Sequence, residues 1–178
     1  EAWLATPDRL AEFQKTHNLD PSQTIAFVSR LYHENRPDML VEAVAWLQGR
    51  FPNVAAVIVG DCPERQGLEQ LARDRGVAER VRFTGAIYDE HELAPWLLSS
   101  RVFCYPEHIG LSLLTAFGFA LPAVTSGNIA GQNPEIVALT PGQNGLLYLD
   151  GSLDSMVDEL ATLLADDRLH AAMSQAAL

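Results

Sequence analysis

The chain has 178 residues, 48% of them hydrophobic, which is enough to build the core of one domain. Its formal net charge of −11 argues against a nucleic-acid partner, because surfaces that bind phosphate backbones concentrate lysine and arginine. No apolar run approaches the roughly 20 residues that cross a bilayer, so we expect a soluble domain.

The N-terminal part predicts a helix at residues 8–15 and a turn-prone segment at 18–22. We expect residues 1–22 to be an entry helix and linker from an N-terminal domain. The first ten residues show neither the basic start nor the apolar stretch of a signal peptide. Cys62 and Cys104 lie in or beside apolar strand patterns, which predicts two reduced, buried thiols and a cytoplasmic setting.

From residue 24 onward, short apolar runs alternate with longer amphipathic stretches. The apolar runs predict strands at residues 24–30, 54–60, 80–84, 102–105, 122–125 and 145–149. The amphipathic stretches predict helices at 36–50, 63–75, 89–99, 111–119 and 153–164, and a further helix begins near residue 166. Nearly continuous apolar strands separated by helices indicate an α/β fold with a Rossmann-like, doubly wound parallel sheet.

Ligands of an open parallel sheet bind at the carboxyl ends of its strands, and the segment after strand 102–105 is the most informative. Gly110 permits close approach of the backbone, and a helix is predicted to begin immediately after it. We expect the free amides of Leu111, Ser112 and Leu113, together with the helix dipole, to face a diphosphate. The Ser112 hydroxyl supplies a further donor. The alternative is that Gly110 and Ser112 only cap a helix.

Lys15 is the only lysine in the chain, so an anionic ligand must be held by arginine, backbone amides and helix N-termini. Arg30 ends the first predicted strand and Arg36 opens the following helix, which makes them the candidate partners of phosphate oxygens. The alternative for either arginine is a surface ion pair, for example with Glu34 or Asp61.

Other chemistries find little support in the sequence. Neither a phosphate-binding G-x-x-x-x-G-K-[ST] nor a dinucleotide-binding G-x-G-x-x-G is present, and the histidines and cysteines lack metal-ligand spacing. A G-x-S-x-G motif is also missing, so a hydrolase is disfavoured. We therefore predict no metal and no cofactor. Glu107 is a candidate acceptor of hydrogen bonds from sugar hydroxyls, although an exposed loop glutamate is equally ordinary.

Seven short motifs occur in an order and spacing that resemble the C-terminal domain of GT-B glycosyltransferases, specifically glycosyltransferase family 4. The motifs cover nearly the whole chain. They are FVSRL (27–31), VIVGD (57–61), VRFTG (81–85), GLSLL (110–114), LPAVTS (121–126), PEIV (134–137) and GQNGLL (142–147).

The resemblance implies a retaining, metal-independent transfer from a UDP- or GDP-type nucleotide sugar, with the acceptor held by an N-terminal domain outside this sequence. That other domain is also where contact with a membrane surface is implied. Site residues are implied as follows: Arg30 contacts the diphosphate; Gly60, Ile109, Gly110, Leu111 and Ser112 line the donor site; Glu107 contacts the sugar; Ile87 and Tyr88 border the base.

Two positions depart from the family pattern. The second of two glutamates separated by seven residues, which is implied to hold the ribose, falls on Thr115, and the phosphate-binding lysine falls on Asn35. Arg36 is then the substitute cation. Three alternatives stay open: a non-catalytic module that binds nucleotide sugars or a protein, a GT-B nucleotide-sugar epimerase, and a glucan phosphorylase-like protein. The phosphorylase-like alternative is disfavoured, because its pyridoxal cofactor is bound to a lysine and the only lysine of the chain is Lys15.

Overall fold

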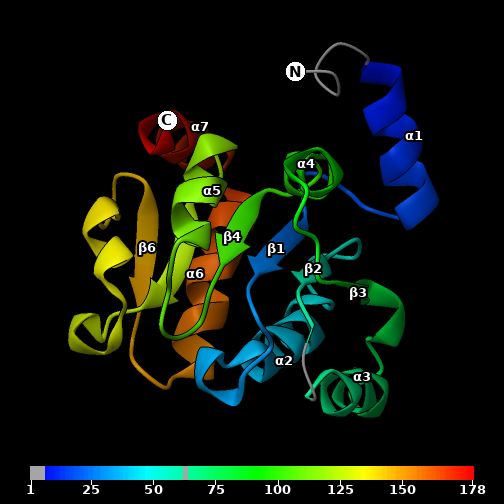
Figure 1. Ribbon diagram of the computed structural model, residues 1–178, viewed down its shortest axis with the longest axis horizontal. Coiled ribbons are helices and arrows are strands. Elements are labelled where there is room, and N and C mark those ends of the chain that lie inside the picture. The colour runs from blue at the N-terminus through cyan, green and yellow to red at the C-terminus, as the bar shows by residue number, and fades with distance from the viewer. Residues whose placement is uncertain (1–6, 62–63) are drawn as a thin grey trace.

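The computed structural model describes residues 7–61 and 64–178, in which six parallel strands form one sheet. The strands lie in the order β3-β2-β1-β4-β5-β6, as in a Rossmann-like sheet (Figure 1). They are β1 (Thr24–Val28), β2 (Ala55–Val59), β3 (Val81–Gly85), β4 (Val102–Cys104), β5 (Ala123–Ser126) and β6 (Gly145–Tyr148). The predicted doubly wound α/β fold is confirmed, because the chain builds the sheet outward from β1 and then outward from β4.

Helices cover both faces of this sheet. They are α1 (Pro7–His17), α2 (Pro37–Leu47), α3 (Arg65–Asp74), α4 (Glu90–Leu98), α5 (Ser112–Gly118), α6 (Leu153–Ala165) and α7 (Asp167–Ala177). α2 contacts both α3 and α6, and in Figure 1 α6 lies behind the sheet while α4 and α5 lie in front of it. α7 contacts α5 and α6, and α1 packs on α4.

The burial of the strands explains their composition. All five residues of β2 are buried, and four of the five residues of β1 are buried as well. Strands covered on both faces have no solvent side, so AAVIV and TIAFV need no alternating polar residues. β3 lies at the edge of the sheet, and only its first residue, Val81, is buried.

Two predicted boundaries at the start of the α/β unit were wrong. β1 ends at Val28 instead of Arg30, because the Arg30 carbonyl accepts a turn hydrogen bond from the Tyr32 amide (2.9 Å). α2 begins at Pro37 instead of Arg36. The backbone of Arg36 is left-handed (φ 52°), whereas the fixed φ of proline suits the first helical turn.

Other differences are small. The helix predicted at 36–50 ends at Leu47, and the amide of Phe51 bonds back to the Leu47 carbonyl (2.8 Å). Four short 3-10 turns were not predicted: His33–Asn35, Ala78–Arg80, Ile129–Gly131 and Pro134–Ala138. Cys62 and the predicted start of the third helix at Pro63 lie outside the described residues. The predicted burial of Cys104 is confirmed, and burial raises the pKa of its free thiol.

α1 is slightly longer than predicted and belongs to the packed domain. The Phe13 ring meets the Trp96 ring of α4 edge to face with centroids 4.8 Å apart, and the His17 ring lies 4.5 Å from the same indole. These contacts attach α1 to the front layer. That residues 1–22 act as a linker from another domain stays a prediction.

Candidate functional site

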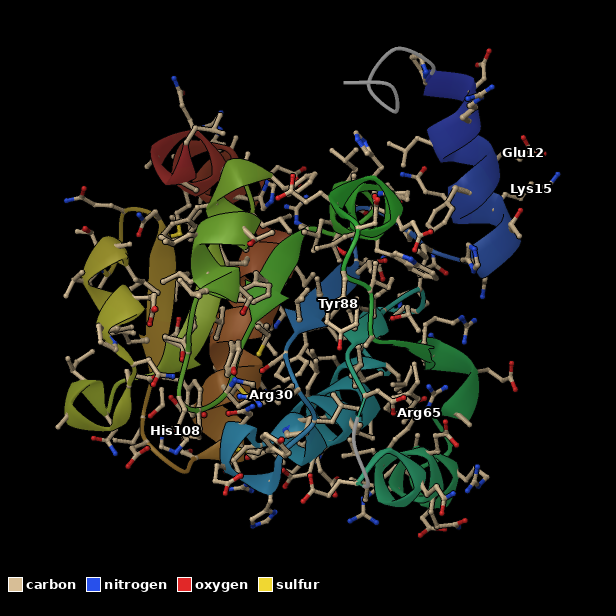
Figure 2. The ribbon with its side chains drawn as sticks, in the orientation of Figure 1. Glu12, Lys15, Arg30, Arg65, Tyr88 and His108 are labelled. Atoms are coloured by element: carbon tan, nitrogen blue, oxygen red, sulfur yellow. The ribbon has the colours of Figure 1, made fainter. Side chains whose placement is uncertain are left out.

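β1 and β4 are neighbours in the sheet although they are far apart in the chain, and the sheet is built outward from this pair in both directions. The loops that follow such a pair diverge and leave a crevice at the carboxyl edge, which is where ligands of this fold class bind. Figure 2 shows Arg30 and His108, one from each loop, at this lower edge of the sheet, with Lys15 far away on α1. The predicted site residues of the two loops are therefore brought together.

Asn35 ties the two loops to each other. Its side-chain amide donates to the Arg30 carbonyl (2.9 Å) and to the Ser29 hydroxyl (3.1 Å), and its own carbonyl accepts from the Glu107 amide (3.4 Å). The Ser29 hydroxyl is also 2.6 Å from the Tyr105 hydroxyl. Asn35 therefore supplies hydrogen bonds that fix the loop after β1. It carries no charge, unlike the lysine expected at this position from the family pattern.

The loop after β4 is held on its other side by the segment that follows β5. The Ile109 amide donates to the side-chain oxygen of Gln132 (2.6 Å), and the side-chain amide of Asn133 donates to the His108 carbonyl (2.6 Å). His108 Nδ1 lies 2.6 Å from the Gly131 carbonyl, and the His108 backbone is left-handed (φ 58°). Contacts from both flanking strand ends thus preset this loop.

Three consecutive amides follow that held loop. Among the described residues, none accepts a hydrogen bond from the N–H of Gly110, Leu111 or Ser112. The prediction for Leu113 was wrong, because its amide donates to the Gly110 carbonyl (2.9 Å) inside the first turn. The hydroxyls of Ser112 and Thr115, one helical turn apart and both half-buried, contribute to the same surface of α5.

The packing of the domain does not itself require glycine at position 110. Among the described residues other than its chain neighbours, a Cβ built there meets a single heavy atom within 4 Å, the Asn133 side-chain nitrogen at 3.7 Å. At position 60, by contrast, the packing of the domain itself requires glycine. The φ angle of Gly60 is 151°, and an added Cβ would stand 1.8 Å from the Ser29 carbonyl oxygen. Gly60 therefore serves the close approach of the loops after β1 and β2.

The two candidate arginines differ in what they contact. Arg30 is exposed, forms no ion pair with any residue in the described ranges, and lies over the Tyr32 ring with its guanidinium carbon 4.9 Å from the ring centroid. The Arg36 guanidinium is bound on two nitrogens by the Asp38 carboxylate (3.0–3.2 Å), and these bonds raise the pKa of Arg36. Arg30 is therefore the more available cation, and the phosphate-binding role of either arginine stays a prediction.

Glu107 lies half-buried at the end of β4 and has acidic and phenolic neighbours. Burial raises the pKa of its carboxyl group, and the nearby Asp150 raises that pKa further. The Tyr148 hydroxyl lies 3.2 Å from Glu107 Oε1 and 3.0 Å from the Pro106 carbonyl. Tyr148 and Asp150 were not predicted as site residues, although the strand-end rule applied to β6 would have drawn attention to them.

The loop after β3 forms the far flank of the edge. The Gly60 amide donates to the Gly85 carbonyl (2.9 Å), so the ends of β2 and β3 adjoin. Ile87 packs partly against the core, whereas Tyr88 is 94% exposed. From β3 to β4 is three strand spacings, about 14 Å, which a base, a diphosphate and a sugar joined in series can span. The positions of Ile87 and Tyr88 suit the predicted base contact, which stays a prediction.

Residues 7–61 and 64–178 contain no group of three or more histidine, cysteine, aspartate or glutamate side chains that could hold a metal ion. Within the same ranges, no helix has the length and apolar character needed to cross a membrane. A cavity of about 450 Å³ lies beside the edge strand β3, and its lining includes Arg65, Arg73 and Arg82.

The sheet order and the loops at its carboxyl edge define a Rossmann-like α/β domain with its ligand edge at the switch point between β1 and β4, and comparison with known sequences identifies the family. The profile of the family described as "Glycosyl transferases group 1" matches residues 8–178, so the chain belongs to that family.

Two relatives match nearly the whole chain. The GDP-mannose-dependent alpha-(1-6)-phosphatidylinositol monomannoside mannosyltransferase of Mycolicibacterium smegmatis is 32% identical over 180 residues, covering 96% of this chain and 46% of the relative. The alpha-D-kanosaminyltransferase of Streptomyces kanamyceticus is 30% identical over 174 residues, covering 96% of this chain and 44% of the relative. The chain thus spans just under half the length of these relatives.

Solved structures show the same fold. The C-terminal domain of a glycosyl transferase group 1 family protein (LpcC) from Francisella tularensis superposes with a TM-score of 0.78 at 22% identity, covering 97% of this chain and 90% of that chain. Anabaena Alr3699/HepE in complex with UDP and glucose gives a TM-score of 0.82 at 20% identity, covering 97% of this chain and 47% of that one.

Proposed function

We propose that this chain is the donor-binding domain of a retaining, metal-independent glycosyltransferase that uses a UDP- or GDP-sugar. The observation that carries the proposal is the row of three unused amides at Gly110, Leu111 and Ser112, next to the switch point between β1 and β4. Backbone N–H groups at the start of a helix stabilise anionic oxygen. Because packing leaves position 110 open, a bound phosphate or sugar supplies the reason for glycine there.

The residues divide the work by chemistry. During transfer the bond between the anomeric carbon and the diphosphate oxygen breaks, and negative charge grows on the departing diphosphate. The three amides and the exposed Arg30 guanidinium stabilise that charge without a metal ion. The Glu107 carboxyl accepts hydrogen bonds from sugar hydroxyls, and the loop with Ile87 and Tyr88 borders the base.

The names of the relatives guide the choice of ligands. Two mannosyltransferases related to this chain are named as GDP-mannose-dependent, and the structurally similar HepE was crystallised with UDP and glucose. GDP and UDP are therefore the nucleotides to test first. We further propose that an N-terminal domain holds the acceptor and makes any contact with a membrane surface, since the relatives are about twice as long as this chain.

Arg30→Ala tests the phosphate contact. Calorimetric titration of the chain with GDP and UDP is expected to show weaker binding by roughly 1.5–3 kcal/mol, the loss typical of a charge-assisted hydrogen bond. Arg168→Ala is the matched control, because Arg168 is an exposed arginine on α7 whose side chain forms no hydrogen bond or ion pair within residues 7–61 and 64–178. Equal affinities of wild type and Arg30→Ala would contradict the role of Arg30.

The longer protein that contains this chain separates the remaining alternatives. Incubation with a labelled nucleotide sugar and an acceptor mixture is expected to give transfer with the anomeric configuration kept. Conversion of the donor to its epimer without an acceptor would favour an epimerase. Donor binding without transfer, epimerisation or hydrolysis would favour a non-catalytic module, in which Asn35 and Thr115 mark lost chemistry.

A further inference from the structure

Tyr148 carries a single polar group into an otherwise apolar environment. It is the last residue of β6 and is only 1% exposed, and its side chain is one of the largest that are fully buried. The hydroxyl reaches the Pro106 carbonyl (3.0 Å) and Glu107 Oε1 (3.2 Å). The Met39 sulfur is a third neighbour of this hydroxyl, at 3.9 Å. The hydroxyl hydrogen, shared among these acceptors, connects the buried end of β6 to the loop after β4.

Asp150 approaches the same carboxyl group from the loop after β6. Its Oδ1 accepts from the Ser126 hydroxyl (2.7 Å), and its Oδ2 accepts from the Asn128 side chain (3.3 Å). The charged and titratable groups that act on Glu107 are Tyr148 on β6, Asp150 after it, His108 on its own loop and, before α2, Arg36. These groups come from three different parts of the chain.

We propose that Tyr148 is a positioning residue for Glu107: its anchored hydroxyl fixes the direction in which the Glu107 carboxyl group meets the sugar of the donor. The inference rests on the proposed function, because it needs a donor sugar beside Glu107. A glutamate at a loop end samples several rotamers, and a hydrogen bond from a side chain locked in the core removes much of that freedom before the ligand arrives. Phenylalanine would keep the packing of Tyr148 and lose this restraint.

The test compares the sugar's share of donor binding in two tyrosine variants. GDP, GDP-mannose, UDP and UDP-glucose are titrated calorimetrically into wild type, Tyr148→Phe and Tyr105→Phe. Tyr105→Phe is the matched control, because it removes another hydroxyl at the same edge, bonded to Ser29 and not to Glu107. We expect Tyr148→Phe to reduce the affinity gained from the sugar about tenfold. The sugar gain is the ratio of the affinity for the nucleotide sugar to the affinity for the nucleoside diphosphate. Tyr148→Phe should bind the nucleoside diphosphate alone as tightly as wild type does. Tyr105→Phe should keep the sugar gain of wild type.

A double variant separates positioning from a general structural effect. If Tyr148 acts through Glu107, Tyr148→Phe has no further effect on the sugar's contribution to affinity once Glu107→Ala is present, because the carboxyl group that Tyr148 positions is then gone. Independent, additive losses would overturn the inference. If wild type binds neither GDP nor UDP, the proposed function fails; if wild type shows a sugar gain that Tyr148→Phe preserves, only the inference fails.

The contacts of Glu107 with Tyr148 and Asp150 can also be tested without a donor, by following the Glu107 carboxyl carbon by NMR as the pH changes. The second variant, Asp150→Asn, changes an exposed residue and leaves the core intact. Tyr148→Phe removes a hydrogen bond that favours the ionised carboxylate, so the pKa of Glu107 should rise; Asp150→Asn removes a neighbouring charge, so that pKa should fall. Opposite displacements are the predicted result. An unchanged or lowered pKa of Glu107 in Tyr148→Phe would overturn the inference.

Discussion

Glu107 shows how a side chain acquires its properties from distant strands. It follows β4, yet burial and the carboxyl group of Asp150, which follows β6, raise its pKa. A carboxyl group whose pKa is raised on folding binds its proton more tightly in the native state than in the unfolded chain. Its ionisation therefore lowers the free energy of unfolding as the pH rises above the ordinary glutamate range.

The stability of Glu107→Gln should consequently depend on pH in a defined direction. Relative to wild type, the variant should gain free energy of unfolding between pH 4 and pH 7, because glutamine has no charge to bury. Urea unfolding at both pH values measures the difference. Glu12→Gln, on the outer surface of α1, is the control for which we expect no such gain. A gain at pH 4 that vanished at pH 7 would have the wrong sign.

The position of several candidate residues at the edge of the sheet could be predicted from one rule. Arg30, Glu107 and Gly110 follow strands, and a parallel sheet brings strand ends to one edge. The strand-end rule could also have pointed to Tyr148 and Asp150, but their contacts with Glu107 could not be predicted, because these depend on the order of β4, β5 and β6 and on side-chain direction. The pairing of Arg36 with Asp38 also escaped prediction, since a left-handed backbone sets it.

The junction of β1, β2 and β3 depends on one backbone position. The pairing of β2 with β3 is irregular between Ile58 and Val59, and Gly60 then lies against the Ser29 carbonyl. Gly60→Ala should destabilise the domain by about 3 kcal/mol or more, because it combines a strained φ with a severe overlap. Gly67→Ala in α3, where a Cβ meets nothing within 4 Å, should instead gain up to about 1 kcal/mol. Thermal unfolding of both variants decides the matter, and a neutral Gly60→Ala would refute this account of the junction.

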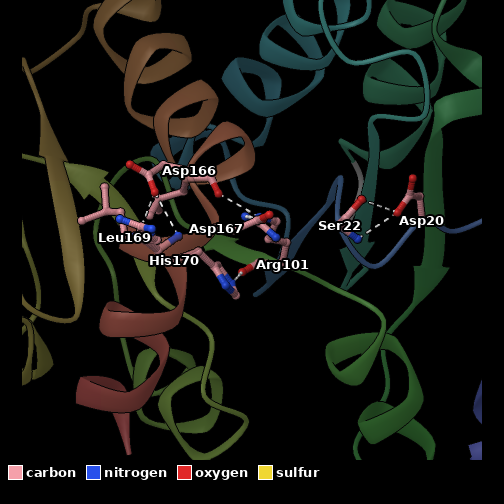
Figure 3. A network of polar contacts seen from close by, with 9 residues as sticks. Asp20, Ser22, Arg101, Asp166, Asp167, Leu169 and His170 are labelled. Carbon is pink, nitrogen blue, oxygen red and sulfur yellow. Dashed lines mark hydrogen bonds and ion pairs between the residues drawn. The ribbon is translucent and has the colours of Figure 1, made fainter.

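Arg101 connects β4 to the two C-terminal helices. Its side chain donates to the Leu163 carbonyl at the end of α6 (2.8 Å) and to the Asp167 carboxylate at the start of α7 (2.7 Å), and its carbonyl lies 2.8 Å from His170 Nε2 (Figure 3). The exposed fraction is 9% for the Arg101 side chain and 91% for that of Asp167.

This asymmetry predicts unequal effects of removing either partner. Arg101→Met should cost roughly 1–3 kcal/mol, because it leaves the buried Leu163 carbonyl without its donor. Asp167→Asn should cost less than about 1 kcal/mol, because solvent already screens that carboxylate. Denaturant unfolding compares the two variants. A larger loss for Asp167→Asn would show that the exposed ion pair, not the buried bond, attaches the helices.

The type and order of the regular elements could be read from periodicity, whereas their ends could not. Apolar runs buried on both faces are long enough to be unambiguous in β1 and β2. Ends depend on local backbone choices, such as the left-handed Arg36 before α2, and the 3-10 turns after β5 arise from contacts with the loop after β4. Such contacts leave no periodic signal.

We propose that the ligand binds at the switch point between β1 and β4, although the cavity beside β3 is lined by three arginines. Several of those arginines are already engaged: Arg65 pairs with Glu69 and Arg82 donates to the His17 carbonyl. The loops after β1 and β4 instead offer amides without a hydrogen-bond acceptor and an arginine without an ion-pair partner among the described residues. The two surfaces involve different strands, β1 and β4 in one case and β3 in the other, so ligand mapping distinguishes them.

Amide NMR of the chain during titration with GDP and UDP tests the central claim most directly. Binding at the switch point predicts that the largest shifts occur at the Gly110, Leu111 and Ser112 amides, with a smaller change at Leu113, whose amide is already bonded. Shifts confined to the residues around Arg65 and Arg82, or none at all with either nucleotide at millimolar concentration, would contradict the assignment of this edge as a donor site.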